Sequence, residues 1–261
     1  QLQSNILLRA INLALNGGWA GVQLRKSVVN CDLNPIAVYQ AMEMAMDAVI
    51  QRGRLAIGGV AELRGNGQLI NRKVLDSCGG FNEKTITDDL DLSFRLLLTR
   101  SPIVIMWDPP IQEEAVESIS ALLRQRKRWA EGGLQRFFDY WPLLISKRLT
   151  RLKKLDLTCF FLLQYALPVV SFIDLIVSII LFERPLYWPL SLVAFSISSL
   201  AYLKGCSGKS EGPRLPLPNI INIIGATIYL AHWFIVIPFI VLKMSLFRKS
   251  LIWDKTNHVG S

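Results

Sequence analysis

The hydrophobic positions follow two different patterns, one on each side of residue 155. Before it, apolar residues come in short periodic stretches that predict helices over 5–15 and 37–51 and a buried strand over 19–24. A second buried strand is expected over 103–107, ending at the two prolines that follow it, because proline cannot donate to a strand ladder. The first part of the chain is therefore expected to mix helices with strands.

Beyond residue 155 the chain is mostly apolar. The runs 155–182, 186–203 and 220–242 each approach or exceed the roughly 20 apolar residues that cross a bilayer. We expect two to four membrane segments, with a cytoplasmic-type polar loop over 204–218. The chain is accordingly divided into a globular part over 1–117, an amphipathic helical region over 118–154, membrane helices over 155–243 and a tail over 244–261.

The composition agrees with a membrane protein, since 51% of the residues are hydrophobic and the net charge of +9 is unevenly placed. Between Arg124 and Lys154, ten lysines and arginines stand against two acids. A basic segment directly before an apolar span marks the cytoplasmic side, whereas a nucleic-acid binder would spread its cations over a folded face. We expect a lipid bilayer as partner and no nucleic acid. The four cysteines lie far apart, so neither a zinc site nor a disulfide framework is expected.

Three carboxylates crowd one predicted helix start. Thr87 is placed to cap this helix, and Asp88, Asp89 and Asp91 fall in its first turn. The apolar positions that follow form a core-facing stripe, namely Leu90, Phe94 and Leu97. Helix capping alone explains part of this pattern. Three like charges within four residues repel one another, however, and one cap would satisfy the helix, so a chemical role stays open.

Two further stretches carry candidate chemistry. Gly65, Asn66 and Gly67 are compatible with a hairpin turn, or with a place where small residues let a sugar or phosphate approach the backbone. A basic amphipathic helix is expected from Ser118, with the apolar face Ile119, Leu122, Leu123, Ala130, Leu134 and Phe137. Gln125 and Trp129 lie one turn apart on the shoulder of that face. The alternative is a helix on the membrane surface anchored by its tryptophan.

These stretches recur in a fixed order along the chain. They are Gly65-Asn66-Gly67, Gly79-Gly80-Phe81, Thr87-Asp88-Asp89-Leu90-Asp91, Gln125-Arg126-Lys127-Arg128-Trp129 and the tail Trp253-Asp254-Lys255-Thr256. Together they resemble the membrane-integrated family 2 glycosyltransferases, the group of cellulose, hyaluronan and poly-N-acetylglucosamine synthases. The amino-acid sequence over 61–67, 85–92 and 128–133 is similar to that of the cyanobacterial β-monoglucosyldiacylglycerol synthases, which move glucose from UDP-glucose to diacylglycerol. The resemblance implies an α/β fold, part of a Rossmann-like GT-A domain, followed by an all-α transmembrane region.

The resemblance also implies roles for individual residues. Asp89 would be the general base of an inverting transfer, with Asp88 beside it. Arg128, and with it Arg126, would neutralise the departing diphosphate, while Gln125 and Trp129 would line the acceptor end. The glycine stretch Gly65, Asn66 and Gly67 would contact substrate, and Trp253, Lys255 and Thr256 would belong to a gating segment that returns over bound nucleotide from the cytoplasmic side.

The sequence departs from the family pattern in two ways. The usual T-E-D is T-D-D here, which keeps the final acid. No Asp-x-Asp precedes Gly65, although the family uses such a motif to hold Mg²⁺ or Mn²⁺ against the UDP-sugar. We therefore interpret the chain as the C-terminal fragment of a longer enzyme, with its metal ligands upstream, and expect this fragment alone to be inactive.

Other functions stay open at this stage. A processive polysaccharide synthase would share these motifs, and a non-catalytic membrane remnant would keep the fold without the donor site. A topology with three full crossings conflicts with the charge distribution. If the basic helix is cytoplasmic, three crossings would place the basic tail on the opposite side of the membrane. We expect one apolar run to be re-entrant or interfacial, or the first run not to be one simple crossing.

Overall fold

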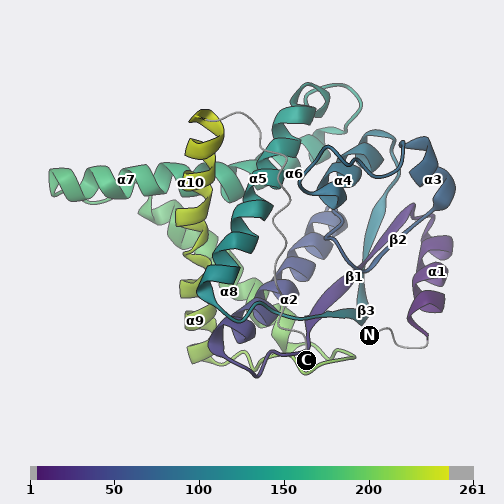
Figure 1. Cartoon of the computed structure of the whole chain (residues 1–261), viewed down its shortest axis with the longest axis horizontal. Helices are drawn as coiled ribbons and strands as arrows, with labels where there is room; N and C mark the ends of the chain where they lie inside the picture. The colour runs from purple at the N-terminus through teal and green to yellow at the C-terminus, as the bar shows by residue number, and fades with distance from the viewer. Residues whose placement is uncertain (1–4, 247–261) are drawn as a thin grey trace.

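The computed structural model describes residues 5–246, and the tail positions Trp253, Lys255 and Thr256 lie outside them. Its sheet has three strands in the order β2-β1-β3, formed by Gln68–Ile70, Gly21–Val28 and Ile103–Glu113. The central strand β1 is antiparallel to β2 and parallel to β3 (Figure 1). The predicted strand over 19–24 is confirmed, and it extends four residues further.

Helices cover both faces of this sheet. Helix α1, Ile6–Gly17, packs on the face that carries Val22 and Leu24 of β1. Helices α2, Pro35–Ala56, and α4, Asp88–Leu98, pack on the other face, against Ile103 and Ile105 of β3. On β1 this second face is polar but buried, with Gln23 2% and Arg25 1% exposed. Buried polar groups need partners, so this face provides contacts to the neighbouring loops.

One local prediction is wrong, and another, the capping of α4 by Thr87, is confirmed in position but not in its side-chain bond. Strand β3 does not end at Pro109 and Pro110 but continues to Glu113, because the ladder shifts register there and these prolines are not required as regular donors. Thr87 precedes α4 and its carbonyl accepts from the Asp91 amide, yet its hydroxyl makes no capping bond. The stripe of Leu90, Phe94 and Leu97 is buried as predicted.

The glycine stretch before β2 is not the turn of a hairpin. Residues 59–64 run as an irregular segment between α2 and this stretch, so no strand precedes it. Gly67 has a φ of +72°, and a Cβ there would lie 2.6 Å from Ile111, so both conformation and space require glycine. The short helix α3, Arg72–Ser77, follows, and it stops before Gly79 and Gly80, both of which have positive φ.

The basic helix α5, Ile119–Leu144, begins with Ser118 accepting a hydrogen bond from the Ala121 amide. Its predicted apolar face is buried except at Leu123, which is partly buried, and at Ile119, which is 65% exposed because it is the first residue of the helix. Helix α5 is part of the folded core, which a helix lying only on a membrane surface would not be. It carries Arg126 and Arg136, both fully buried, into the protein interior and packs against α4 and α10.

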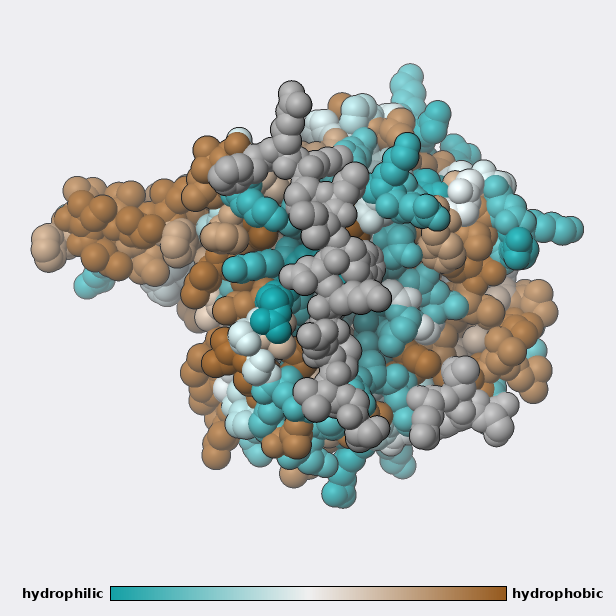
Figure 2. All heavy atoms as spheres, viewed as in Figure 1, coloured by the Kyte–Doolittle hydropathy of each residue, from teal (hydrophilic) through white to brown (hydrophobic). Residues whose placement is uncertain are grey.

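Three long apolar helical stretches follow, so three candidate membrane spans are present among residues 5–246. The first is continuous from α6, Arg151–Phe161, through the π-helical turn η1, Leu162–Ala166, into α7, Leu167–Leu181. The others are α8, Trp188–Ser207, and the pair α9, Ile220–Leu230, with α10, Trp233–Leu246. Figure 1 shows α7 projecting away from the rest of the molecule, and its surface is strongly apolar in Figure 2.

Candidate active site

The segment Glu62-Leu63-Arg64 is held at its backbone by three buried side chains. The Glu62 amide donates to Gln51 of α2, the Leu63 amide to Ser93 of α4 and the Arg64 amide to Gln23 of β1, each at 2.7 Å. These bonds replace the ladder that a strand would have supplied, because buried amides need acceptors. The segment is therefore fixed to three different elements at once.

The same contacts place the start of α4 beside the glycine stretch. The Ser93 hydroxyl, which accepts from Leu63, also donates to the Asp89 carbonyl at 2.8 Å. A Cβ built on Gly65 would lie 3.9 Å from both the Asp89 Oδ2 and the Lys26 Nζ. Gly65 has a φ of +82°, a left-handed backbone conformation that favours glycine, at the point where the chain passes the Asp89 carboxylate. Asp89, Gly65 and Lys26 therefore border one small space.

The environment of Asp89 suits a proton acceptor. Burial raises the pKa of the Asp89 carboxyl above its ordinary 3.8, and neighbouring Asp88 adds to the rise. The backbone at the helix start and the cations Arg64 and Lys26 oppose it. Because burial dominates, the net shift is upward, toward the range in which a carboxylate is an effective base near neutral pH.

Trp129 of α5 lies near one of these three residues, Lys26. The Lys26 ammonium, which lies beside Asp89, is 5.9 Å from the centre of the Trp129 ring. Lys26 also pairs with Glu113 at 3.0 Å, and these two residues lie at the carboxyl ends of the parallel strands β1 and β3. Ligand sites of open parallel sheets form at this edge. The carboxylate and the indole thus share one neighbouring cation and one end of the sheet.

The other expected site residues lie partly on α5 beside Trp129 and partly in the protein interior. Asp88, Gln125 and Arg128 are half-buried, and Gln125 and Arg128 lie on α5 with Trp129, while the Asn66 carbonyl accepts from Gln23 at 3.0 Å. Arg126 points inward, fully buried, where it pairs with Glu43 of α2 and stacks at 4.2 Å on Trp129. A guanidinium already neutralised inside the protein does not fit the expected role of diphosphate ligand, so Arg126 is better described as a support for the indole.

No group of three histidine, cysteine or acidic side chains that could hold a metal ion occurs within residues 5–246. The three carboxylates at the start of α4, Asp88, Asp89 and Asp91, do not form such a group either. Asp91 accepts from Arg95 and Tyr140, both at 2.8 Å, so its oxygens are engaged. The described residues therefore do not fit the Mg²⁺ or Mn²⁺ that the resemblance implies.

Comparison with known proteins agrees with the geometry. Residues 2–247 match the family described as glycosyl transferase family group 2. The chain belongs to this family. Its small mixed sheet with flanking helices, followed by three apolar helices, is the GT-A-like domain and membrane region expected of such a member.

Three cyanobacterial relatives are similar over nearly the whole chain, and each is named beta-monoglucosyldiacylglycerol synthase. The protein from Synechocystis is 40% identical over 97% of this chain and 54% of its own length. Those from Trichormus variabilis and Nostoc are 38% and 37% identical over all of this chain and 57% of theirs. The chain therefore spans little more than half the length of these family members.

Several residues that border the candidate site were not predicted from the sequence. Lys26 lies two residues beyond the predicted strand, which ended at residue 24, and Glu113 lies beyond the prolines where β3 was expected to end. Glu62 and Arg64 lie in the stretch 61–67 that carries the resemblance, but no role was predicted for them. The alternation of apolar Val22 and Leu24 with polar partners on β1 is the signal that these polar side chains face a second, buried surface.

Proposed function

We propose that the protein transfers a hexose, namely glucose, from a UDP-sugar to a membrane lipid such as 1,2-diacylglycerol, with inversion at the anomeric carbon. The observation that supports this best is the shared space of Asp89, Gly65 and Lys26, with the Trp129 ring 5.9 Å from the same ammonium. The names of the three cyanobacterial relatives support the donor sugar and the acceptor class.

In the proposed step, the acceptor hydroxyl oxygen attacks the anomeric carbon while its proton passes to the Asp89 carboxylate. The bond from the anomeric carbon to the UDP oxygen breaks, and negative charge develops on the diphosphate. Arg128 on α5 is the proposed cation for that charge. The Trp129 indole offers a flat apolar face to the sugar or to the glycerol backbone. Asp88 stays a neighbour whose charge raises the pKa of the base.

A lipid acceptor is favoured by the position of the site. Helix α5, which carries Trp129, packs against α10 of the third apolar stretch, so the acceptor end borders the candidate membrane helices. A lipid can reach such a site sideways from the bilayer. The basic segment that precedes the first span supports a catalytic side facing the cytoplasm.

The test uses the protein at its natural length in membranes supplied with radiolabelled UDP-glucose and diacylglycerol. A single labelled glycolipid on thin-layer separation is expected, and a water-soluble or insoluble polymer would instead support a processive polysaccharide synthase. Asp89→Asn is expected to abolish transfer and leave membrane insertion unchanged. Turnover retained in Asp89→Asn would remove Asp89 from the role of base.

A further inference from the structure

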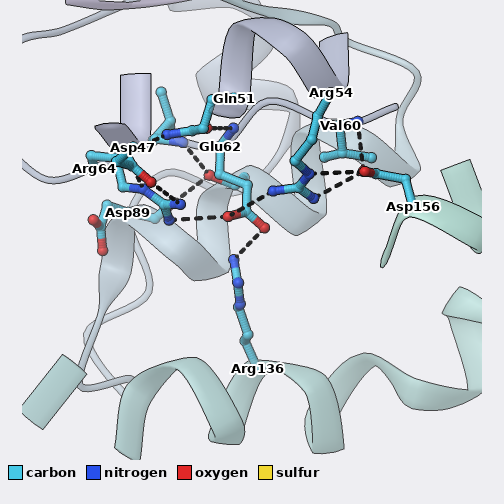
Figure 3. Close-up of polar contacts among 11 residues, drawn as sticks. Asp47, Gln51, Arg54, Val60, Glu62, Arg64, Asp89, Arg136 and Asp156 are labelled. Atoms are coloured by element: carbon cyan, nitrogen blue, oxygen red, sulfur yellow. Dashed lines mark hydrogen bonds and ion pairs between the residues drawn. The ribbon is translucent and has the colours of Figure 1, made fainter. Parts of the chain in front are cut away.

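Glu62 is a fully buried carboxylate on which three arginines converge (Figure 3). Its Oε1 lies 2.9 Å from Arg136 of α5, and its Oε2 lies 3.0 Å from Arg64 and 3.9 Å from Arg54 of α2. These cations hold the pKa of Glu62 at about 2 although burial alone would raise it. A buried charge is tolerated only when paired in this way, so Glu62 is ionised and fixed.

Two more carboxylates balance the cluster. Asp47 of α2 accepts two hydrogen bonds from Arg64, at 3.1 Å from Nε and 3.0 Å from Nη2. Asp156 of α6 accepts two from Arg54, both at 2.9 Å, and one from the Val60 amide. The cluster therefore has one end beside Asp89 and another at the start of the first candidate membrane span.

The Arg64 guanidinium is occupied on all three nitrogens by protein carboxylates. Nε and Nη2 bind Asp47, and Nη1 pairs with Glu62. A forked guanidinium engaged in this way has no face left for bidentate binding of a phosphate. Its positive charge nevertheless lies next to Asp89, which borders the residue that follows Arg64 (Figure 3). Arg64 is thus close to the base yet unsuited to bind the donor.

We propose that Arg64 is a positioning residue of the transfer reaction, held by Glu62 and Asp47 so that its charge keeps Asp89 in the carboxylate form that accepts the proton. This inference rests on the proposed function. Among the described residues, the charged groups that act most strongly on Asp89 are Arg64 from the irregular segment, Asp88 from α4 and Lys26 from β1, and Lys26 is paired with Glu113 of β3.

The test is the pH profile of kcat/KM for UDP-glucose, measured for the protein at its natural length with saturating diacylglycerol. Arg64→Gln removes the charge, so the acid limb is expected to move to higher pH by about one unit, because the carboxylate is then protonated more easily. Arg64→Lys keeps a cation, so its acid limb is expected to lie close to that of the unsubstituted protein.

Two matched variants test the direction and the location of the effect. Asp47→Asn removes a charge that neutralises Arg64, so the acid limb is expected to move a few tenths of a unit to lower pH. The Asp47 side chain is 34% exposed, which makes this variant tolerable if Arg64→Gln does not fold. Arg54→Lys perturbs the same cluster at its membrane end and is expected to leave the limb in place.

Two outcomes would overturn the inference. An unchanged acid limb in Arg64→Gln with a raised KM for UDP-glucose would make Arg64 a substrate ligand. An unchanged limb with a uniformly lower kcat would make it merely structural. Asp89→Asn is measured in parallel: if it keeps turnover, the proposed function fails, whereas if only the limb fails to move, the inference about Arg64 fails alone.

Discussion

Gly132 on α5 is the position where a single added methyl group tests how the site is held. A Cβ there would lie 2.5 Å from the Cγ2 and 2.9 Å from the Cβ of Thr87, and closer still to its hydroxyl oxygen. Carbon atoms pack at about 3.5–4.0 Å, so in Gly132→Ala the helix and Thr87 must separate by about 1 Å. Thr87 precedes Asp89 by two residues, and this displacement therefore reaches the proposed base.

The magnitude follows from two opposing effects. Overpacking a close contact costs about 1–3 kcal/mol, whereas alanine is better than glycine in a helix interior by about 0.5–1 kcal/mol. We expect Gly132→Ala to lose about 0.5–2 kcal/mol of unfolding free energy. A misplacement of about 1 Å at a reacting group lowers turnover by about 100-fold, so the loss of activity should exceed the loss of stability.

Thermal unfolding in detergent and turnover of UDP-glucose measure the two effects. The matched control is Gly53→Ala in α2, where a Cβ would meet nothing within 4 Å, and it is expected to gain about 0.5–1 kcal/mol with turnover unchanged. Thr87→Ala added to Gly132→Ala removes two of the three clashing atoms and is expected to recover part of the activity. Equal stability and turnover in Gly132→Ala and Gly53→Ala would refute the reasoning.

Two other predictions concern the buried carboxylate and the indole. Because the pKa of Glu62 is about 2 in the folded protein against an ordinary 4.5, its stabilisation is complete above pH 4.5 and is lost as pH falls through 2. Glu62→Gln should therefore lose about 3 kcal/mol of unfolding free energy at pH 7 and much less near pH 2.5, and an equal loss at both would contradict this. Trp129→Ala should raise the KM for the lipid acceptor more than that for UDP-glucose, as separate saturation curves would show; equal increases would place the indole elsewhere.

Helix and strand positions followed from periodicity wherever one face of an element is apolar. Helix α1 and the three apolar stretches lie close to their predicted limits, and α4 begins where it was predicted, because their burial pattern is visible in the sequence. Strand β3 was cut short because proline is usually a strand breaker, and only the register shift opposite β1 shows why it continues.

The site was harder to predict than the fold, for a physical reason. Asp89 and Trp129 were identified from motifs, but the cation between them, Lys26, comes from a strand about 60 residues before the first and 100 before the second. Likewise, nothing local shows that Arg126 would turn inward. Its partner Glu43 is 83 residues away, and only tertiary packing brings the two charges together.

The contacts of Arg126 show that the membrane helices help to position the site. Its guanidinium pairs with Glu43, donates to Tyr229 of α9 at 2.9 Å and lies 4.2 Å over Trp129 and 5.6 Å over Trp233 of α10. A buried ion pair of this kind is costly unless its geometry is fixed from several sides. Here one side is α2 of the sheet domain and the other is the third apolar stretch. The orientation of the indole therefore depends on the helices that are apolar enough to enter the bilayer, which is the arrangement required if the acceptor is to approach Trp129 from the lipid.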